Sequence, residues 1–142
     1  MTIATLAQEL AAYENTHSLC SADRIAALFD ASQDPRCTVL VARKAEQIIA
    51  FAIYYPGYDL SSDTYGFHVA DICVSAAHRR QGTGKQLMHA IAQEALSQNR
   101  HWISLTVLQE NQAALAFYQS LGLSHVPVYF MAAGRTTLSS IR

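Results

Sequence analysis

The fold of this chain is decided by the stretch Val74-Ser75-Ala76-Ala77-His78-Arg79-Arg80-Gln81-Gly82-Thr83-Gly84-Lys85-Gln86-Leu87-Met88. It leaves an apolar strand, crosses a basic turn with two glycines and continues as an amphipathic helix. Glycine permits positive φ and lets a ligand approach the backbone closely. The first turn of the helix presents unpaired N–H groups, and its dipole favours an anion. The stretch therefore predicts a phosphate-binding turn, in which Arg79, Arg80 and Lys85 supply positive charge.

Helix and strand patterns alternate around this turn. Helices are predicted at 3–14, from Ser21 to Asp34-Pro35, from the glycine turn to about Gln98, and at 111–121. Strands are predicted at 37–43, 47–55, 65–74, 102–108 and 125–132. Pro56-Gly57 should end the second strand, Pro127 should place the last one at an edge or a bulge, and the polar tail after Gly134 should be loose.

This order of elements predicts an α/β fold with a mixed, mostly antiparallel sheet and helices on both faces. No repeat or linker interrupts the sequence, so residues 1–142 are expected to form a single domain. Alternation along 65–74 should place one set of side chains on one face and a second set on the other. The first set is His68, Ala70, Ile72 and Val74, and the second is Val69, Asp71 and Cys73.

Composition excludes several classes of protein. A net charge of −1 argues against a general nucleic-acid binder. No apolar run approaches the roughly 20 residues that span a bilayer, and no basic segment precedes an apolar one at the start, so neither a membrane protein nor a secreted one is expected. Three scattered cysteines indicate reduced thiols in a cytoplasm. The six histidines lack metal-ligand spacing, so no metal is expected.

Two familiar phosphate loops do not fit the turn. A Walker loop needs glycine where Arg79 stands and Ser or Thr where Gln86 stands. A dinucleotide fingerprint needs a third glycine at Leu87. The pattern that remains is Arg79-x-x-Gly82-x-Gly84 at the start of a helix.

That pattern resembles the acetyl-coenzyme A loop of the GNAT superfamily of N-acetyltransferases. The stretch Asn111-Gln112-Ala113-Ala114-Leu115-Ala116-Phe117-Tyr118-Gln119-Ser120-Leu121-Gly122 is similar to the family's second cofactor motif. Three further segments resemble the diamine/polyamine (spermidine/spermine-type) branch: 6–14, 51–59 and 107–112. The resemblance implies the GNAT fold and acetyl-CoA as cosubstrate, whereas the acceptor amine stays open.

The resemblance also implies roles for individual residues. Backbone groups of Ile72, Cys73 and Val74 should hold the pantetheine arm like an added strand, and Asn111 should bind the cofactor nearby. The pyrophosphate should lie on backbone amides of the turn, with added charge from Arg79 or Arg80: Arg80, Gln81, Gly82, Thr83, Gly84 and Lys85. Tyr118 should protonate the leaving thiolate, since a phenol with a pKa of about 10 holds its proton at neutral pH.

The sequence departs from the family at two places. Ala70 stands where the diamine branch has a glutamate that helps to deprotonate the amine. His68 is the substitute base that we favour, ahead of Asp63 and Glu110, and an enzyme without a dedicated base is the alternative. Met1-Thr2 leaves no room for the family's first strand, so strand 37–43 should be a sheet edge. An exposed edge invites pairing, and a homodimer is expected.

The sequence therefore predicts an N-acetyltransferase that moves an acetyl group from acetyl-CoA to a primary amine of a small molecule by direct attack. One alternative is a protein or peptide N-acetyltransferase. A second alternative is a non-catalytic acyl-CoA-binding module, which the missing carboxylate at Ala70 keeps open.

Overall fold

The computed structural model describes residues 2–15, 21, 23–24 and 37–140. The chain divides into two compact units, Met1–Thr106 and Val107–Arg142. The expectation of one domain over 1–142 stays a prediction. Most of the predicted second helix lies outside the described residues. Within them, Ser21 Oγ accepts a hydrogen bond from Arg24 N–H at 3.3 Å, as a helix N-cap does.

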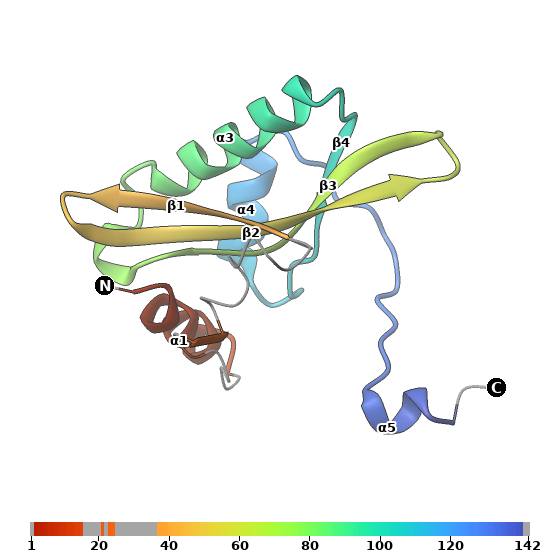
Figure 1. The fold of residues 1–142 in the computed structure, drawn as a ribbon, viewed down its shortest axis with the longest axis horizontal. Helices are drawn as coiled ribbons and strands as arrows, with labels where there is room; N and C mark the ends of the chain where they lie inside the picture. Colours follow the sequence, from red (N-terminus) through yellow and green to blue (C-terminus); the bar gives the residue numbers. More distant parts are fainter. Residues whose placement is uncertain (1, 16–20, 22, 25–36, 141–142) are drawn as a thin grey trace. The chain divides into compact units, whose positions relative to one another are not determined.

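The first unit is a four-stranded sheet with a helix on each face (Figure 1). Its strands lie in the order β1 (Thr38–Lys44), β2 (Gln47–Asp59), β3 (Thr64–Val74) and β4 (Trp102–Leu105). The first three are antiparallel, and β4 runs parallel to β3. Helix α1 (Ile3–Tyr13) covers one face and α3 (Thr83–Ser97) covers the other. This arrangement confirms the predicted mixed sheet with helices on both faces.

Strand β2 continues past the point where Pro56-Gly57 was expected to end it. Pro56 pairs with Phe67 and Gly57 with Gly66, so the β2–β3 hairpin extends to Asp59. The pairing of β1 with β2 ends at Tyr54. Beyond Tyr54 one side of β2 has no neighbour in the described sheet, and a proline without an N–H is tolerated at such an edge. The prediction was therefore wrong about where the strand ends.

A bulge in β3 changes which side chains share a face. Ile53 pairs with Asp71 and Tyr54 with Val69, which leaves Ala70 as the extra residue on β3. One extra residue reverses the alternation of side chains beyond it. His68 therefore shares the α1 face with Asp71 and Cys73, and not with Ile72 and Val74. The face assignment predicted by strict alternation was wrong for this reason.

Each face of the sheet has its own core. On the α1 face, Leu6, Phe51 and Cys73 are buried together, and Ile53 packs against them. On the α3 face, buried Tyr54 packs edge-on against Phe67 at 5.0 Å between ring centroids. The Tyr54 hydroxyl donates a hydrogen bond to Glu94 of α3. The pKa of Tyr54 is raised, mainly because the phenol is buried. These contacts fix both helices to the strands.

The indole of Trp102 packs on two glycines of the β2–β3 hairpin. A Cβ at Gly66 would lie 2.0 Å from the Trp102 ring, and one at Gly57 would lie 2.7 Å from it. Only glycine leaves room for the ring at these two positions. The contact joins β4 to the hairpin at the Gly66–Trp102 pair, which is the first pair between β3 and β4.

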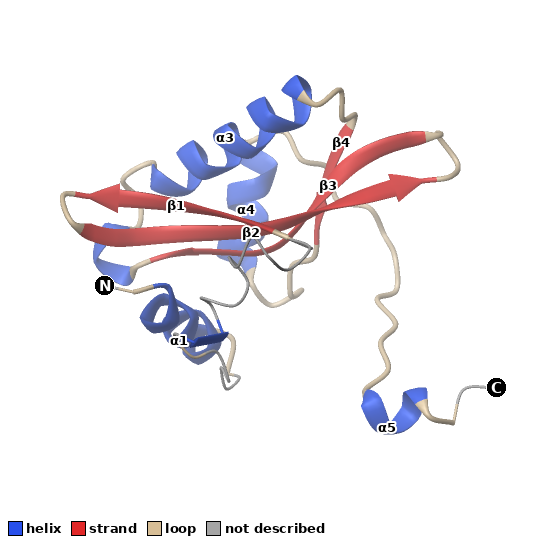
Figure 2. Cartoon of the chain, viewed as in Figure 1, coloured by secondary structure: helices blue, strands red, loops and turns tan. Residues whose placement is uncertain are grey.

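In the second unit, α4 (Gln112–Ser120) has the predicted end signals. Asn111 Oδ1 accepts from Ala114 N–H at 3.1 Å as the N-cap, and Gly122 follows the helix with φ of 91°. The strand predicted at 125–132 is absent from the described residues 123–134, which are loop (Figure 2). A strand needs a neighbour for its backbone groups, and Tyr129 is 96% exposed. The tail, predicted to be loose, contains a short helix, α5 (Arg135–Leu138).

Candidate active site

The glycine turn ends in a helix start suited to an anion. Arg80 and Gly82 both have positive φ, 59° and 86°, and Gly82 is the N-cap of α3. Gln86 N–H donates to Gly82 O at 3.0 Å as the first bond of the helix. The N–H groups of Thr83, Gly84 and Lys85 precede that bond and point out of the helix end. With no acidic residue in the first turn, the helix dipole there favours a negative ligand.

The basic residues of the turn divide into two kinds. Arg79 is tied to the protein, because its Nε donates to Val74 O at 3.0 Å and its guanidinium lies 5.2 Å from the centre of the Tyr13 ring. Arg80 and Lys85 are exposed beside the helix start. Gln81 Nε2 donates to Ala77 O at 3.1 Å and so braces the turn. The turn thus offers backbone N–H groups together with two exposed basic side chains, Arg80 and Lys85.

Strands β3 and β4 pair only from Gly66 to Val69. From Ala70 onward the edge of β3 that faces away from β2 is not paired within the described sheet. Ser75 N–H donates to Ile49 O of β2 at 2.9 Å, and backbone groups alternate in direction along a strand. Cys73 therefore directs its backbone groups toward β2, whereas Ile72 and Val74 direct theirs to the open edge. This edge leads directly into the glycine turn.

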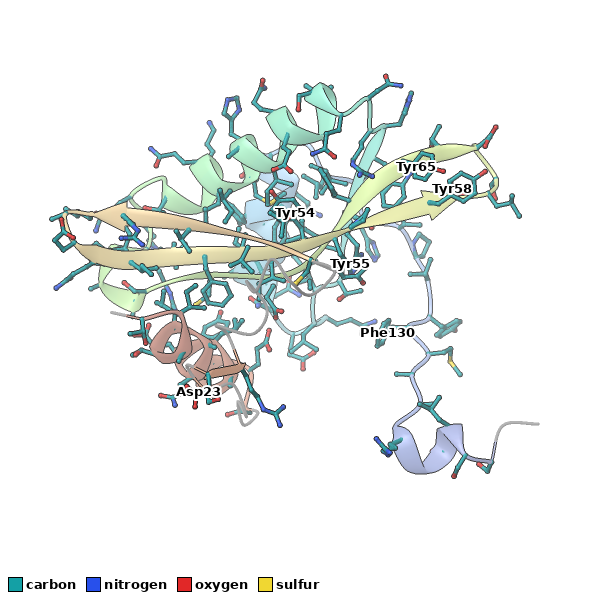
Figure 3. All side chains as sticks on the ribbon, viewed as in Figure 1. Asp23, Tyr54, Tyr55, Tyr58, Tyr65 and Phe130 are labelled. Carbon is teal, nitrogen blue, oxygen red and sulfur yellow. The ribbon has the colours of Figure 1, made fainter. Side chains whose placement is uncertain are left out.

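Three side chains form a row across the α1 face where the strands still pair. Tyr55, His68 and Ser104 are register partners on β2, β3 and β4. His68 Nδ1 lies 3.0 Å from Ser104 Oγ, and the Tyr55 ring lies 5.1 Å from the imidazole. Figure 3 shows Tyr54 and Tyr55 on opposite sides of β2. Sequence reasoning found His68 but not its two partners, because strand register is not visible in local patterns.

Asp71 joins this face through the bulge. Strict alternation along 65–74 places Asp71 on the opposite face from His68. The structure places the two on the same face, and desolvation raises the pKa of Asp71 although the residue is exposed. Ala70 itself is exposed and carries no group that could take a proton.

Tyr118 and Asn111 lie on one side of α4, since seven residues make close to two helical turns. Tyr118 is half-buried, and burial raises the pKa of its phenol to about 12. Its ring lies 5.0 Å from that of Phe117. The phenol is therefore protonated throughout the neutral range.

The weaker base candidates have other contacts or positions. Asp63 accepts a hydrogen bond from the Tyr58 hydroxyl at 2.5 Å in the β2–β3 turn, far along the hairpin from Ala70. Glu110 is exposed in the turn before α4. Within the described part of the chain, no group of three or more His, Cys, Asp or Glu side chains is placed to hold a metal ion.

Comparison with known proteins gives the class. Residues 4–123 match the model of the acetyltransferase (GNAT) family, so the chain belongs to that family. It is 27% identical over 92 residues to L-ornithine N5-acetyltransferase NATA1 of Arabidopsis thaliana. That match covers 63% of this chain and 40% of the relative, so the chain spans less than half of the relative's length.

Solved structures share the fold at low sequence identity. An integron cassette protein from the mobile metagenome of V. cholerae has a TM-score of 0.79 and 22% identity, covering 97% of this chain and 88% of the other. The aminoglycoside acetyltransferase meta-AAC0020 from a soil metagenome has a TM-score of 0.75 and 20% identity, with coverage of 94% and 88%. A ribosomal-protein-alanine N-acetyltransferase from Brucella melitensis biovar Abortus 2308 has a TM-score of 0.70 and 23% identity, covering 94% of this chain and 91% of the other.

None of the described helices is both long enough and apolar enough to cross a bilayer.

Proposed function

We propose that this protein is an N-acetyltransferase that uses acetyl-CoA and acetylates a primary amine of a small molecule. The observation that carries the proposal is the continuity of two features in the first unit. The open edge of β3 leads into the glycine turn, and the turn ends at the helix start formed by Gly82 and Thr83. The family match over residues 4–123 supports the same chemistry.

The residues present fit coenzyme A. Its pyrophosphate suits the backbone N–H groups of the turn from Arg80 to Lys85, where Gly82 has open space and φ of 86°. Its pantetheine amides suit the open edge of β3, and the backbone direction favours Ile72 and Val74 over Cys73 for this contact. The family resemblance also assigns a cofactor contact to Asn111, the N-cap of α4. When bound, acetyl-CoA supplies an acetyl thioester that an amine can attack.

Two side chains are proposed to handle protons. Tyr118 holds a proton on its phenol oxygen and is the general acid for the leaving thiolate. His68 is the general base for the amine, because its imidazole lies on the α1 face two residues before the strands part. Asp71 is the alternative base that the bulge adds to the same face.

The acceptor class is supported by relatives of two kinds. The Arabidopsis relative is named for ornithine, and one structural neighbour is named for aminoglycosides. Ornithine and aminoglycosides are both small molecules that carry amines. The Brucella neighbour is named for ribosomal-protein alanine and favours the alternative, a protein or peptide amine. The small-molecule reading is preferred because the relative found by sequence supports it.

A panel of amines tests the proposal. Purified protein is incubated with acetyl-CoA and with diamines, polyamines, basic amino acids, aminoglycosides and peptides, and release of free thiol is followed. Turnover with a small amine is the expected result, and turnover with peptides alone would reverse the order of the two acceptors. If no amine reacts but acetyl-CoA at ~100 times its dissociation constant raises stability by about 2.7 kcal/mol, the protein is a binding module.

Assembly and compartment are part of the same proposal. Strand β1 pairs with β2 alone in the described sheet, and this edge supports a homodimer. Sedimentation equilibrium would test it, with a monomer mass at all concentrations as the contrary result. Cys37 and Cys73 are both free thiols in the structure, in keeping with a reducing compartment such as the cytoplasm.

A further inference from the structure

The row Tyr55–His68–Ser104 lies next to the point where the sheet opens. The pairing of β3 with β4 ends at Val69, and Ala70 is the bulge residue. His68 is therefore the last residue of β3 on the α1 face before the open edge begins at Ala70. A ring held here would lie beside the edge that is proposed to take the pantetheine arm.

The contacts of the imidazole use only one of its two nitrogens. Nδ1 faces Ser104 Oγ at 3.0 Å, and the Tyr55 ring lies against one side of the imidazole at an interplanar angle of 47°. Within the described part of the chain, Nε2 has no hydrogen-bond partner. In a neutral imidazole the bond made by one nitrogen sets whether the other carries the proton. The partner at Nδ1 thus decides what Nε2 can do.

The charged groups around this face are few among the described residues. Asp71 on β3 shares the face, and Tyr55 and Ser104 are the neighbours on β2 and β4. From α1, Glu9 accepts a hydrogen bond from Ala76 N–H at 3.3 Å, Tyr13 lies under Arg79, and Glu14 ends the helix. Asp71 is therefore the carboxylate to be separated from His68 in any titration.

We propose that Ser104 is a positioning residue for His68. Its hydroxyl oxygen accepts a hydrogen bond from Nδ1–H, which keeps a lone pair on Nε2. That lone pair takes a proton from the ammonium group of the acceptor, giving an imidazolium and a neutral amine whose own lone pair can attack. The inference rests on the proposed acetyltransferase function and assigns to it a residue outside the glycine turn and α4.

The hydrogen-bond part can be measured without any substrate. Nitrogen-15 NMR of the imidazole rings reports which nitrogen carries the proton, and the His68→Gln variant assigns the His68 signals by their loss. We expect the Nδ1–H form in the wild type and in Ser104→Thr, and a shift toward Nε2–H in Ser104→Ala. Ser97→Ala, a hydroxyl removed at the far end of α3, is the matched control and should match the wild type. A wild-type ring protonated at Nε2 would overturn the proposal.

The catalytic part is measured as a pH profile. Ser104→Ala should lower kcat/KM roughly tenfold, a fraction of the 10²–10⁴ that general acid–base catalysis contributes, and should move its acidic limb. Ser104→Thr should restore both, and Ser97→Ala should change neither. His68→Gln should abolish the limb.

Three outcomes would count against the proposal, and each one refutes a different part of it. If His68→Gln removes the limb but Ser104→Ala keeps the wild-type profile, the Ser104 role is wrong and the acetyltransferase function stands. If Asp71→Asn removes the limb and His68→Gln does not, Asp71 is the base and the role of His68 is wrong. If the wild type acetylates no amine, the proposed function and the proton transfer both fail, and the NMR result alone decides whether Ser104 positions the ring.

Discussion

At the scale of single residues, the bulge at Ala70 determines which groups can act together. It reverses the alternation of β3, so Asp71 and Cys73 share a face with His68. It also falls where β3 and β4 stop pairing. One small residue therefore lies between the row that carries the candidate base and the edge that is proposed to take the cofactor.

Replacing Gly66 by alanine should destabilise the first unit. The new Cβ would lie 2.0 Å from the Trp102 ring, and overpacking of this kind costs about 1–3 kcal/mol or more. Urea unfolding followed by circular dichroism measures the change. Gly134→Ala is the matched control, since a Cβ there meets no atom within 4 Å and should leave stability nearly unchanged. Equal stability of Gly66→Ala and the wild type would contradict the packing of Trp102 on Gly66.

Replacing Tyr118 by phenylalanine should lower kcat by about a hundredfold or more, because the general acid is lost while the buried ring is kept. Steady-state kinetics with the best amine of the panel measures the change. Tyr129→Phe removes the same hydroxyl from an exposed side chain of the same unit and should keep the wild-type kcat. Since the pKa of Tyr118 is raised to about 12, the wild-type kcat should show no loss from its ionisation near neutral pH. Full activity of Tyr118→Phe would remove the assignment.

At the scale of elements, the start of α3 combines two requirements in one position. Gly82 adopts a left-handed conformation and is the N-cap of the helix. The following N–H groups are turned outward with no acidic side chain among them. The amphipathic remainder of α3 buries Leu87 and Ile91 on the sheet and holds this start in place.

Gly82→Asp should weaken acetyl-CoA binding by at least roughly tenfold. The added carboxylate repels the pyrophosphate. Left-handed backbone also costs a non-glycine residue about 1–2 kcal/mol, which favours a turn whose N–H groups no longer point at the ligand. Titration calorimetry measures the dissociation constant. Gln98→Asp adds the same charge at the other end of α3 and should leave affinity unchanged. Gly82→Ala separates strain from repulsion, and an unaltered affinity of Gly82→Asp would refute the anion site.

At the scale of the whole molecule, buried proton-bearing groups tie stability to pH. Burial raises the pKa of the Cys73 thiol from 9.0 to about 11 and that of Tyr118 from 10.0 to about 12. Both groups hold their protons more tightly in the folded chain than in the unfolded one. Their stabilising contribution is therefore complete below about pH 9 and is lost as the pH rises toward 11 and then 12.

The free energy of unfolding should accordingly fall with pH above about 9. Urea unfolding at a series of pH values from neutral to alkaline measures this slope. In Cys73→Ala the slope should be flatter and should begin at higher pH, whatever stability the smaller side chain loses at neutral pH. A slope in Cys73→Ala equal to that of the wild type would show that the thiol is not the group responsible.

The sequence by itself determined the features whose physical cause is local. Glycine at a positive φ and unpaired N–H groups at a helix start follow from neighbouring residues, so the turn at Gly82 and the cap at Asn111 were predictable. The family was predictable for the same reason, since its motifs lie in those turns. The ends of strands were less predictable. A proline such as Pro56 ends a central strand but is tolerated at a sheet edge, and only the strand pairing shows that this part of β2 is an edge.

Tertiary structure alone decided what depends on strand register. The sequence cannot show that Ala70 is a bulge, that Asp71 turns to the face of His68, or that Ser104 stands beside the imidazole, because each is a relation between strands far apart in the chain. The expected strand at 125–132 failed for a related reason. An apolar run becomes a strand only when a neighbour takes its backbone hydrogen bonds, and a local pattern does not supply that neighbour.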